Sequence, residues 1–231
     1  RQEFDIIALG DLRRCILALS NAPIFMQQIF EHRFTSNGTL NGHSLGNLMI
    51  TATIQQTNSD KEGLNQIQNV LNVKNKVLPV TLEKCILCAE LENGDLILEE
   101  ENIDIPKIFP RPKIKRVFLD KNAEINKECE KAINEADFIT FGPGDLYTSI
   151  IPNLLVRGMK EAIKKSKAKK IYICNLMIKN GETNEFLASD FVKEITNYLG
   201  CNIDYVILNK EVPGKDILDR YKKENAELVK N

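Results

Sequence analysis

The chain has 231 residues, of which 31 are Lys or Arg and 32 are Asp or Glu, so its formal net charge is −1. This balance excludes a global field that would steer the protein toward nucleic acid or a membrane surface. No stretch approaches the roughly 18 uninterrupted apolar residues of a membrane span, and the first residues do not resemble a signal peptide. We therefore expect a cytoplasmic protein with no membrane span and no nucleic-acid partner.

The cysteines offer half of a zinc motif. Cys85 and Cys88 have the required spacing, but no second pair of Cys or His ligands follows, because His32 and His43 are the only histidines. We expect the six cysteines to be mostly buried thiols in a reducing compartment.

The first predicted elements are two helices. The segment from Asp11 to about Leu19 is amphipathic and follows Gly10. Asp11 is expected to cap this helix, because a carboxylate accepts free N–H groups and favours the positive end of the helix dipole. A second helix after Pro23 is expected to turn its large apolar side chains inward: Phe25, Ile29, Phe30 and Phe34.

A glycine-rich loop, residues 38–48, then runs into an apolar helix that is expected to begin at Leu48. Free N–H groups at a helix start attract anions. The small residues around His43 leave room for a ligand beside a titratable ring, although a structural histidine is the alternative. Ser44 as a nucleophile is rejected, because no strand precedes it and its neighbours do not fit the nucleophile elbow.

The middle of the chain predicts a helix over 61–73 and a hairpin over 84–90 and 96–100, closed through Asn93-Gly94-Asp95. This antiparallel insert spans about residues 77–105. Strands and helices then alternate, and a βαβ pattern implies a parallel sheet with helices on both faces. The expected strands are 117–119, 137–141, 171–174 and 205–208, and the expected helices are 123–136, 153–166 and 189–199.

The stretch around Gly142-Pro143-Gly144 carries the strongest functional signal. It joins the strand ending at Phe141 to a helix with Pro152 in its first turn. Glycines allow a close approach of backbone to ligand, so we predict a phosphate or nucleotide site at the carboxyl end of this strand. An ordinary tight turn is the alternative. Asn175 and Asn209 also follow predicted strands, where an asparagine is either a ligand contact or a turn former.

Residues 42–48, 142–155 and 174–177, the last followed by 181–183, together resemble the CofD-like superfamily, in its branch of gluconeogenesis factors of the YvcK type. The resemblance implies one modified Rossmann-like α/β domain over 1–231. Its best-known enzyme, 2-phospho-L-lactate transferase, moves a phospholactyl group from a guanine nucleotide to a deazaflavin precursor with magnesium. The gluconeogenesis factors imply binding of a uridine-diphosphate sugar, UDP-N-acetylglucosamine or UDP-glucose, and a role in cell shape and wall synthesis during gluconeogenic growth.

The resemblance also implies a site, carried over position by position. The nucleotide diphosphate is expected at the Gly-Pro-Gly loop and the hydroxyls that follow it, with other groups facing the same cleft. A homodimer is compatible with the resemblance. The expected ligand-binding residues are Gly10, Asp11, His43, Ser44, Gly46, Asn47, Gly142, Pro143, Gly144, Asp145, Tyr147, Thr148, Ser149 and Asn175.

Two departures from the family pattern leave alternatives open. The chain begins just after the family's glycine-rich amino-terminal segment, so part of the phosphate site is expected to be missing. Asp145 stands where the family has a serine, and a carboxylate beside a diphosphate is repelled unless a cation lies between them. Asp145 therefore either recruits magnesium or weakens nucleotide binding.

No basic residue lies inside the loop to take the charge of a leaving phosphate, which favours a non-catalytic sensor that requires no cofactor. The alternative is a transferase in which Asp11, Asp145 and magnesium act together. A scaffold role for the hairpin is compatible with the sensor but has no support of its own.

Overall fold

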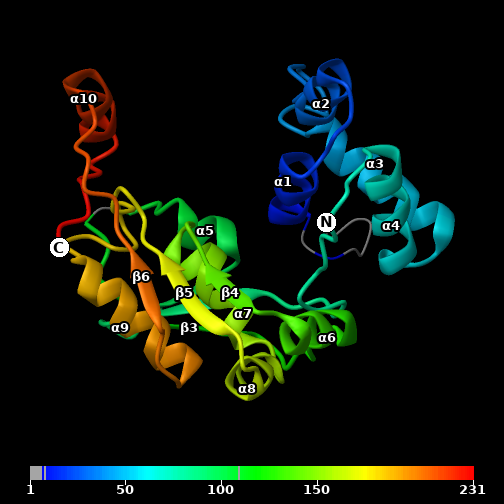
Figure 1. The fold of residues 1–231 in the computed structure, drawn as a ribbon. Coiled ribbons are helices and arrows are strands. Elements are labelled where there is room, and N and C mark those ends of the chain that lie inside the picture. Colours follow the sequence, from blue (N-terminus) through cyan, green and yellow to red (C-terminus); the bar gives the residue numbers. More distant parts are fainter. Residues whose placement is uncertain (1–6, 8, 109) are drawn as a thin grey trace. The chain divides into compact units, whose positions relative to one another are not determined.

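The structure, a computed structural model, describes residue 7, residues 9–108 and residues 110–231. The chain divides into two compact units, Arg1–Lys84 and Cys85–Asn231 (Figure 1). The prediction of one domain over the whole chain stays a prediction. Within the described ranges, no helix is both long enough and apolar enough to cross a membrane.

The first unit is built from helices around a single apolar core. Ile16, Phe30, Ile50 and Leu71 are fully buried in it. Leu64 and Ile67 of the fourth helix are buried in the same core, so each of the four helices among the described residues contributes to it. Their bounds are α1 Gly10–Ala18, α2 Ile24–Glu31, α3 Leu45–Thr57 and α4 Asp60–Val70.

Three expectations for this unit are corrected. Asp11 does not cap α1, because the helix starts one residue earlier, at Gly10, and places the exposed Asp11 side chain inside the first turn. Phe25 is 71% exposed although Phe30 is fully buried. The two are five residues apart, which is about 140° around a helix, so both cannot face the core. Helix α3 begins at Leu45, three residues before the expected start, because Ser44 caps it.

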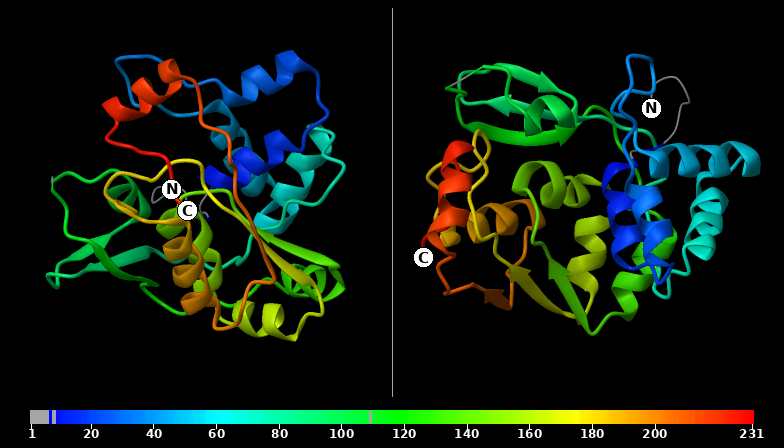
Figure 2. Two further views of the ribbon diagram at one scale, coloured as in Figure 1. Left: turned by 60° about the vertical axis from the view of Figure 1, so that its left-hand side comes forward. Right: turned by 90° about the horizontal axis from the view of Figure 1, so that it is seen from above.

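The described residues of the second unit form two separate three-stranded sheets, and Figure 2 shows the ribbon from two further sides. One is antiparallel, in the order β2-β1-β3, and the other is parallel, in the order β4-β5-β6. The bounds are β1 Leu87–Leu91, β2 Leu96–Leu98, β3 Ile114–Leu119, β4 Phe138–Phe141, β5 Lys169–Ile173 and β6 Tyr205–Ile207.

The predicted hairpin is confirmed as β1 and β2. The predicted strand over 117–119 exists as the end of β3, but it pairs with β1 and not with the parallel sheet. The register explains this choice, because it sets Ala89 opposite Val117, and both side chains are buried. The insert is therefore a three-stranded sheet.

The parallel sheet confirms the α/β class. The π-helix η1 and the helices α7 and α8 connect β4 to β5, and α9 connects β5 to β6 (Figure 1). The helix expected over 153–166 is divided at Gly158, whose φ of +91° is left-handed. Helix α7 packs against β3, α8 and α9, so it joins the antiparallel sheet to the rest of the unit. The helical bounds are α5 Glu100–Asp104, the π-helix Leu146–Ile150 (η1), α6 Lys127–Glu135, α7 Ile151–Leu155, α8 Met159–Lys165, α9 Ala188–Leu199 and α10 Lys215–Lys223.

The six cysteines all lie in the described residues and form no disulfide there, as expected from their scatter. Cys88, Cys129 and Cys174 are buried, whereas Cys15 is exposed on α1. The expectation of buried thiols therefore holds for only part of the set.

Candidate functional site in the second unit

The Gly-Pro-Gly loop is held against the neighbouring strand. Gly142 has a φ of +74°, and a Cβ added there would lie 3.0 Å from the carbonyl oxygen of Ile173, at the end of β5. Only glycine fits this backbone position without strain. The side chain of Asn175 donates from Nδ2 to the carbonyl oxygen of Gly144 at 2.8 Å, and its Oδ1 accepts from the Gly144 N–H at 3.4 Å. Asn175 therefore fixes the loop to the end of β5.

A pocket of about 330 Å³ lies at this loop, beside the carboxyl end of β4. Four of the predicted ligand residues line it, namely Gly142, Pro143, Gly144 and Ser149. Most of the other lining side chains are apolar, so the pocket combines loop backbone with a hydrophobic wall. The remaining lining residues are Ile133, Ile139, Thr140, Phe141, Ile150, Asn153, Leu154, Met159 and Ile163.

The structure gives Tyr147 and Thr148 a different environment from the predicted one. Both are buried, and both are bonded to carboxylates: the Thr148 hydroxyl donates to Glu182 at 3.1 Å, and the Tyr147 hydroxyl donates to Glu194 at 3.1 Å. Both hydroxyl groups therefore already donate a hydrogen bond within the protein. Ser149 is the hydroxyl of this segment that lines the pocket.

Glu182 is the buried charge of the site. Its side chain is 4% exposed and also accepts a hydrogen bond from the Tyr147 N–H at 3.1 Å. Burial raises the pKa of Glu182 to about 7, and the neighbouring Asp145 acts in the same direction. The hydrogen bonds from Tyr147 and Thr148 and the charge of Lys179 oppose that rise. The carboxyl group therefore titrates near neutral pH.

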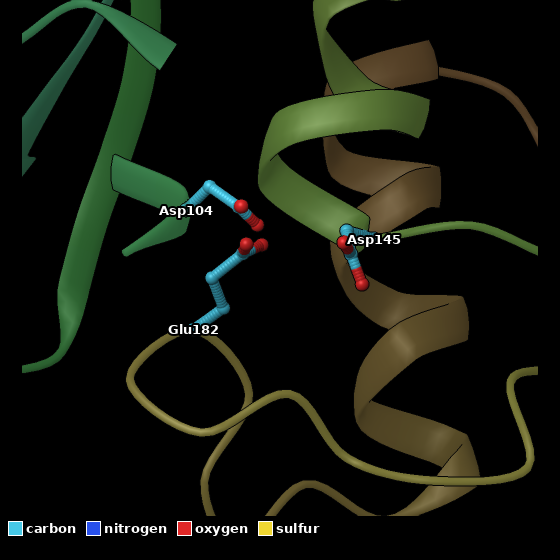
Figure 3. Close-up of side chains that lie close together, drawn as sticks. All are labelled: Asp104, Asp145 and Glu182. Atoms are coloured by element: carbon cyan, nitrogen blue, oxygen red, sulfur yellow. The ribbon is translucent and has the colours of Figure 1, made fainter. Parts of the chain in front are cut away.

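Lys179 joins two further carboxylates. Its Nζ lies 2.7 Å from Oδ1 of Asp104 and 3.4 Å from Oδ2 of Asp145. One oxygen from each of Asp104, Asp145 and Glu182 lies within 4.8 Å of the others, and Figure 3 shows Asp104 and Glu182 pointing toward one another. Three carboxylates could hold a hard divalent cation. In the structure, however, the ammonium of Lys179 already neutralises part of their charge.

The other predicted site residues belong to the first unit. Ser44 is buried and caps α3, its hydroxyl oxygen accepting from the Asn47 N–H at 3.1 Å. Gly46 is buried in the first turn of that helix, while His43 is exposed just before it. Gly10 and Asp11 are exposed at the start of α1. That these residues face the same ligand as the Gly-Pro-Gly loop stays a prediction.

Comparisons with known proteins agree with the motifs. The family model described as "2-phospho-L-lactate transferase CofD" matches residues 1–231. This chain belongs to the CofD family. It is 43% identical over 231 residues to the "Gluconeogenesis factor" of Halalkalibacterium halodurans, covering 99% of this chain and 70% of that protein. It is 40% identical over 231 residues to the "Gluconeogenesis factor" of Bacillus subtilis, covering 99% of this chain and 72% of that protein.

A solved structure shows the same fold. The crystal structure of a Bacillus halodurans protein of the upf0052 family superposes on this CofD-family chain with a TM-score of 0.93 at 42% identity. The match covers 100% of this chain and 73% of that one. The resemblance drawn from the glycine-rich motifs is therefore confirmed at the level of family and fold.

Sequence reasoning missed three residues of the candidate site. Glu182 belongs to residues 181–183, which carry part of the family resemblance, but the sequence of this segment indicates no partner for the carboxylate. Lys179 and Asp104 gave no local signal, because their contact joins segments far apart in the chain. The Gly-Pro-Gly loop itself contains no basic residue. Lys179, which lies outside the loop, nevertheless places its ammonium 3.4 Å from the carboxylate of Asp145, so a positive charge is present beside the loop.

Proposed function

We propose that this chain is a regulatory factor that binds a uridine-diphosphate sugar, such as UDP-N-acetylglucosamine or UDP-glucose, at the Gly-Pro-Gly pocket. Its role would be in cell shape and wall synthesis during growth on gluconeogenic carbon sources, in the cytoplasm. The observation that carries the proposal is the pocket at the carboxyl end of β4, formed by loop backbone and apolar side chains. The names of the relatives support the gluconeogenic context.

The size of the pocket limits what it holds. Small-molecule sites usually occupy roughly 300–1,000 Å³, so 330 Å³ is at the lower end of that range. We therefore assign the pocket to one moiety of the nucleotide sugar, the base or the sugar. The diphosphate would lie at the loop, where Ser149 offers a hydroxyl.

The charge around the loop supports binding without a metal. Asp145 would repel a diphosphate, but the ammonium of Lys179 lies 3.4 Å from its carboxylate and offsets that charge. Lys179 also lies 2.7 Å from Asp104, so this compensation is partial, but it lowers the repulsion that a diphosphate meets at the loop in the absence of a metal.

The cluster of Asp104, Asp145 and Glu182 favours a second candidate function. A transferase of the 2-phospho-L-lactate type, using a guanine nucleotide and magnesium, would need carboxylate ligands of this kind. Magnesium would supply charge stabilisation for the transferred phosphoryl group. Metal-dependent binding of GDP separates this candidate from the sensor.

The test is calorimetric titration of the chain with UDP-N-acetylglucosamine and with GDP, each with magnesium and with a chelator. The sensor proposal expects saturable binding of the uridine ligand that is unchanged by the chelator. Binding of GDP alone, and only with magnesium, would favour the transferase. Binding of neither ligand would contradict both functions for this chain.

Gly144→Val is expected to weaken UDP-N-acetylglucosamine binding by about tenfold or more, because its side chain enters a pocket-lining position. The backbone tolerates the change: a Cβ at Gly144 would make ordinary contacts of 3.5 Å with Ser149 and 3.6 Å with Ile150. Gly38→Val is the matched control, because Gly38 is exposed in a loop and a Cβ there would make only an ordinary contact of 3.9 Å with Oγ of Ser36. An unchanged affinity in a variant with a wild-type melting temperature would remove the loop from the site.

A further inference from the structure

The connection between α5 and β3 contains an arginine that donates to the backbone of two different segments. Nη1 of Arg111 donates to the carbonyl oxygen of Ile103 at 2.6 Å, and Nε donates to the carbonyl oxygen of Gly181 at 2.9 Å. Nη2 also donates to the Gly181 oxygen. Ile103 lies in α5, whereas Gly181 lies 70 residues after Arg111, in the connection between β5 and α9. One guanidinium therefore bridges two segments that are far apart in the sequence.

Each of the two carbonyls directly precedes a carboxylate of the candidate site. Ile103 is followed by Asp104, the last residue of α5, and Gly181 is followed by Glu182. Figure 3 shows these two side chains pointing toward one another from α5 and from the connection between β5 and α9. A carbonyl and the following Cα lie in one peptide plane. Fixing the two oxygens therefore limits where both acidic side chains can begin.

Glu182 connects this bridge to the pocket. Its carboxylate accepts hydrogen bonds from the N–H of Tyr147 and the hydroxyl of Thr148, the second and third residues of η1. The next residue, Ser149, lines the pocket. A displacement of Glu182 would therefore remove two hydrogen bonds from the turn that carries Ser149.

A charged donor and close packing both strengthen the bridge. Burial lowers the pKa of the Arg111 guanidinium, but the charges of Glu182 and Asp104 oppose that shift, and a guanidinium stays protonated in proteins. Its bonds to the two carbonyls are therefore charge-assisted, which is the stronger class of hydrogen bond. Gly181 has a φ of +84°, and a Cβ added there would lie 2.5 Å from Cγ of Pro106, so a larger residue would separate the two segments.

We propose that Arg111 is a positioning residue for the nucleotide-sugar site. By bonding the two carbonyls, it fixes Glu182 against η1 and Asp104 against the ammonium of Lys179. It thereby determines the position of the positive charge beside the Gly-Pro-Gly loop and of the turn that carries Ser149. The inference rests on the proposed function, because it takes this loop to contact the ligand. Its geometric part, the placement of Glu182 by Arg111, can be measured without a ligand.

Arg111→Met removes the bridge and keeps most of the apolar stem. The Tyr147 amide reports the effect, because its acceptor is Glu182. Its hydrogen-exchange rate without ligand, measured by NMR, should rise by about tenfold or more, since a displaced acceptor leaves the N–H open to water. The Val117 amide is the internal control: it also donates to a side chain of this unit, the Tyr198 hydroxyl at 2.8 Å, and should keep its wild-type rate. An unchanged Tyr147 rate, or an equal acceleration of both amides, would overturn the proposal.

Lys113→Met is the matched control variant. It removes one positive charge from the same connection, and Lys113 contacts the segment after β5 through an ion pair with Glu185, whose side chain is 80% exposed. Exposed ion pairs contribute little, so both amides should exchange at wild-type rates. Arg111→Lys keeps the charge without the planar group that bonds both carbonyls, so it should behave like Arg111→Met. Wild-type exchange in Arg111→Lys would mean that charge alone is required, and the bridge would be rejected.

Calorimetric titration with UDP-N-acetylglucosamine connects the bridge to ligand binding. Both Arg111 variants should bind the ligand about tenfold more weakly than the wild type, and Lys113→Met should bind it equally well. Wild-type affinity in an Arg111 variant with an accelerated Tyr147 amide would contradict the positioning role. If the wild-type protein does not bind the ligand, the proposed function fails and the ligand part of this inference fails with it. The exchange rates still decide whether Arg111 places Glu182.

Discussion

The wild-type protein is expected to lose stability as the pH rises from about 4.5 to about 7. The substitution Glu182→Gln is expected to abolish this pH dependence. The folded-state pKa of Glu182 is raised from its ordinary value of 4.5 to about 7, chiefly by burial. The folded protein therefore holds a proton in this range that the unfolded chain releases. Its stabilising contribution is complete below pH 4.5 and is lost as the pH passes the folded-state pKa.

The size of the effect follows from the pKa change. A rise of this extent corresponds to about 3 kcal/mol in the free energy of unfolding. Glutamine keeps the local hydrogen bonds, since its oxygen can accept from the Tyr147 N–H and its NH₂ can donate to the Thr148 hydroxyl oxygen. The variant should therefore be more stable than the wild type at pH 8 and similar to it at pH 4.

Urea denaturation followed by circular dichroism at several pH values measures this difference. Glu185→Gln is the control, because Glu185 lies in the same segment with its side chain 80% exposed and paired to Lys113 at 3.1 Å. The control should keep the wild-type pH profile. A Glu182→Gln profile parallel to the wild type would mean that Glu182 is already ionised throughout the range.

The Gly-Pro-Gly loop could be predicted from the sequence because its signals are local. An apolar run that ends in Gly142-Pro143-Gly144 indicates a strand followed by a turn, and the structure has both. The pairing of Asn175 with Gly144 was not predictable in the same way. Its position after a strand indicated only that it lies at the same sheet edge, where a ligand and a neighbouring loop are equally available partners.

Strand pairing shows the same limit. The pattern around Val117 correctly indicated a strand, because alternation and β-branched residues act on the local backbone. The prediction that this strand belongs to the parallel sheet was wrong, because it pairs with β1 instead. The choice between the two sheets depends on which buried faces meet across the strands. The ion pairs of Lys179 with Asp104 and Asp145 belong to the same class of non-local facts.

Helix registers could be predicted only in part. Phe25 and Phe30 were both expected to face the core, but a helix places them on different sides, and Phe25 is exposed. Composition identifies an apolar helix, whereas the starting residue decides which of its side chains are buried.

Gly46→Ala is expected to destabilise the first unit by about 2 kcal/mol. An added Cβ would lie 2.5 Å from the carbonyl oxygen of Phe30 and 2.9 Å from Cδ of Arg13. Such overpacking costs about 3 kcal/mol when the contacted atom belongs to the backbone and cannot rotate away. The higher helix propensity of alanine recovers only about 1 kcal/mol. The cost of the steric conflict therefore exceeds the gain from helix propensity.

Gly10→Ala is the matched control, because Gly10 is also a glycine in the first turn of a helix, and a Cβ there would have nothing within 4 Å. It should be neutral or more stable by up to about 1 kcal/mol. Both glycines were predicted to contact the ligand, so the melting temperatures and UDP-N-acetylglucosamine affinities of the two variants separate packing from binding. If Gly46→Ala keeps wild-type stability but loses affinity, Gly46 is required for ligand binding. The close approach of α2 to α3 would then not be the reason for a glycine at this position.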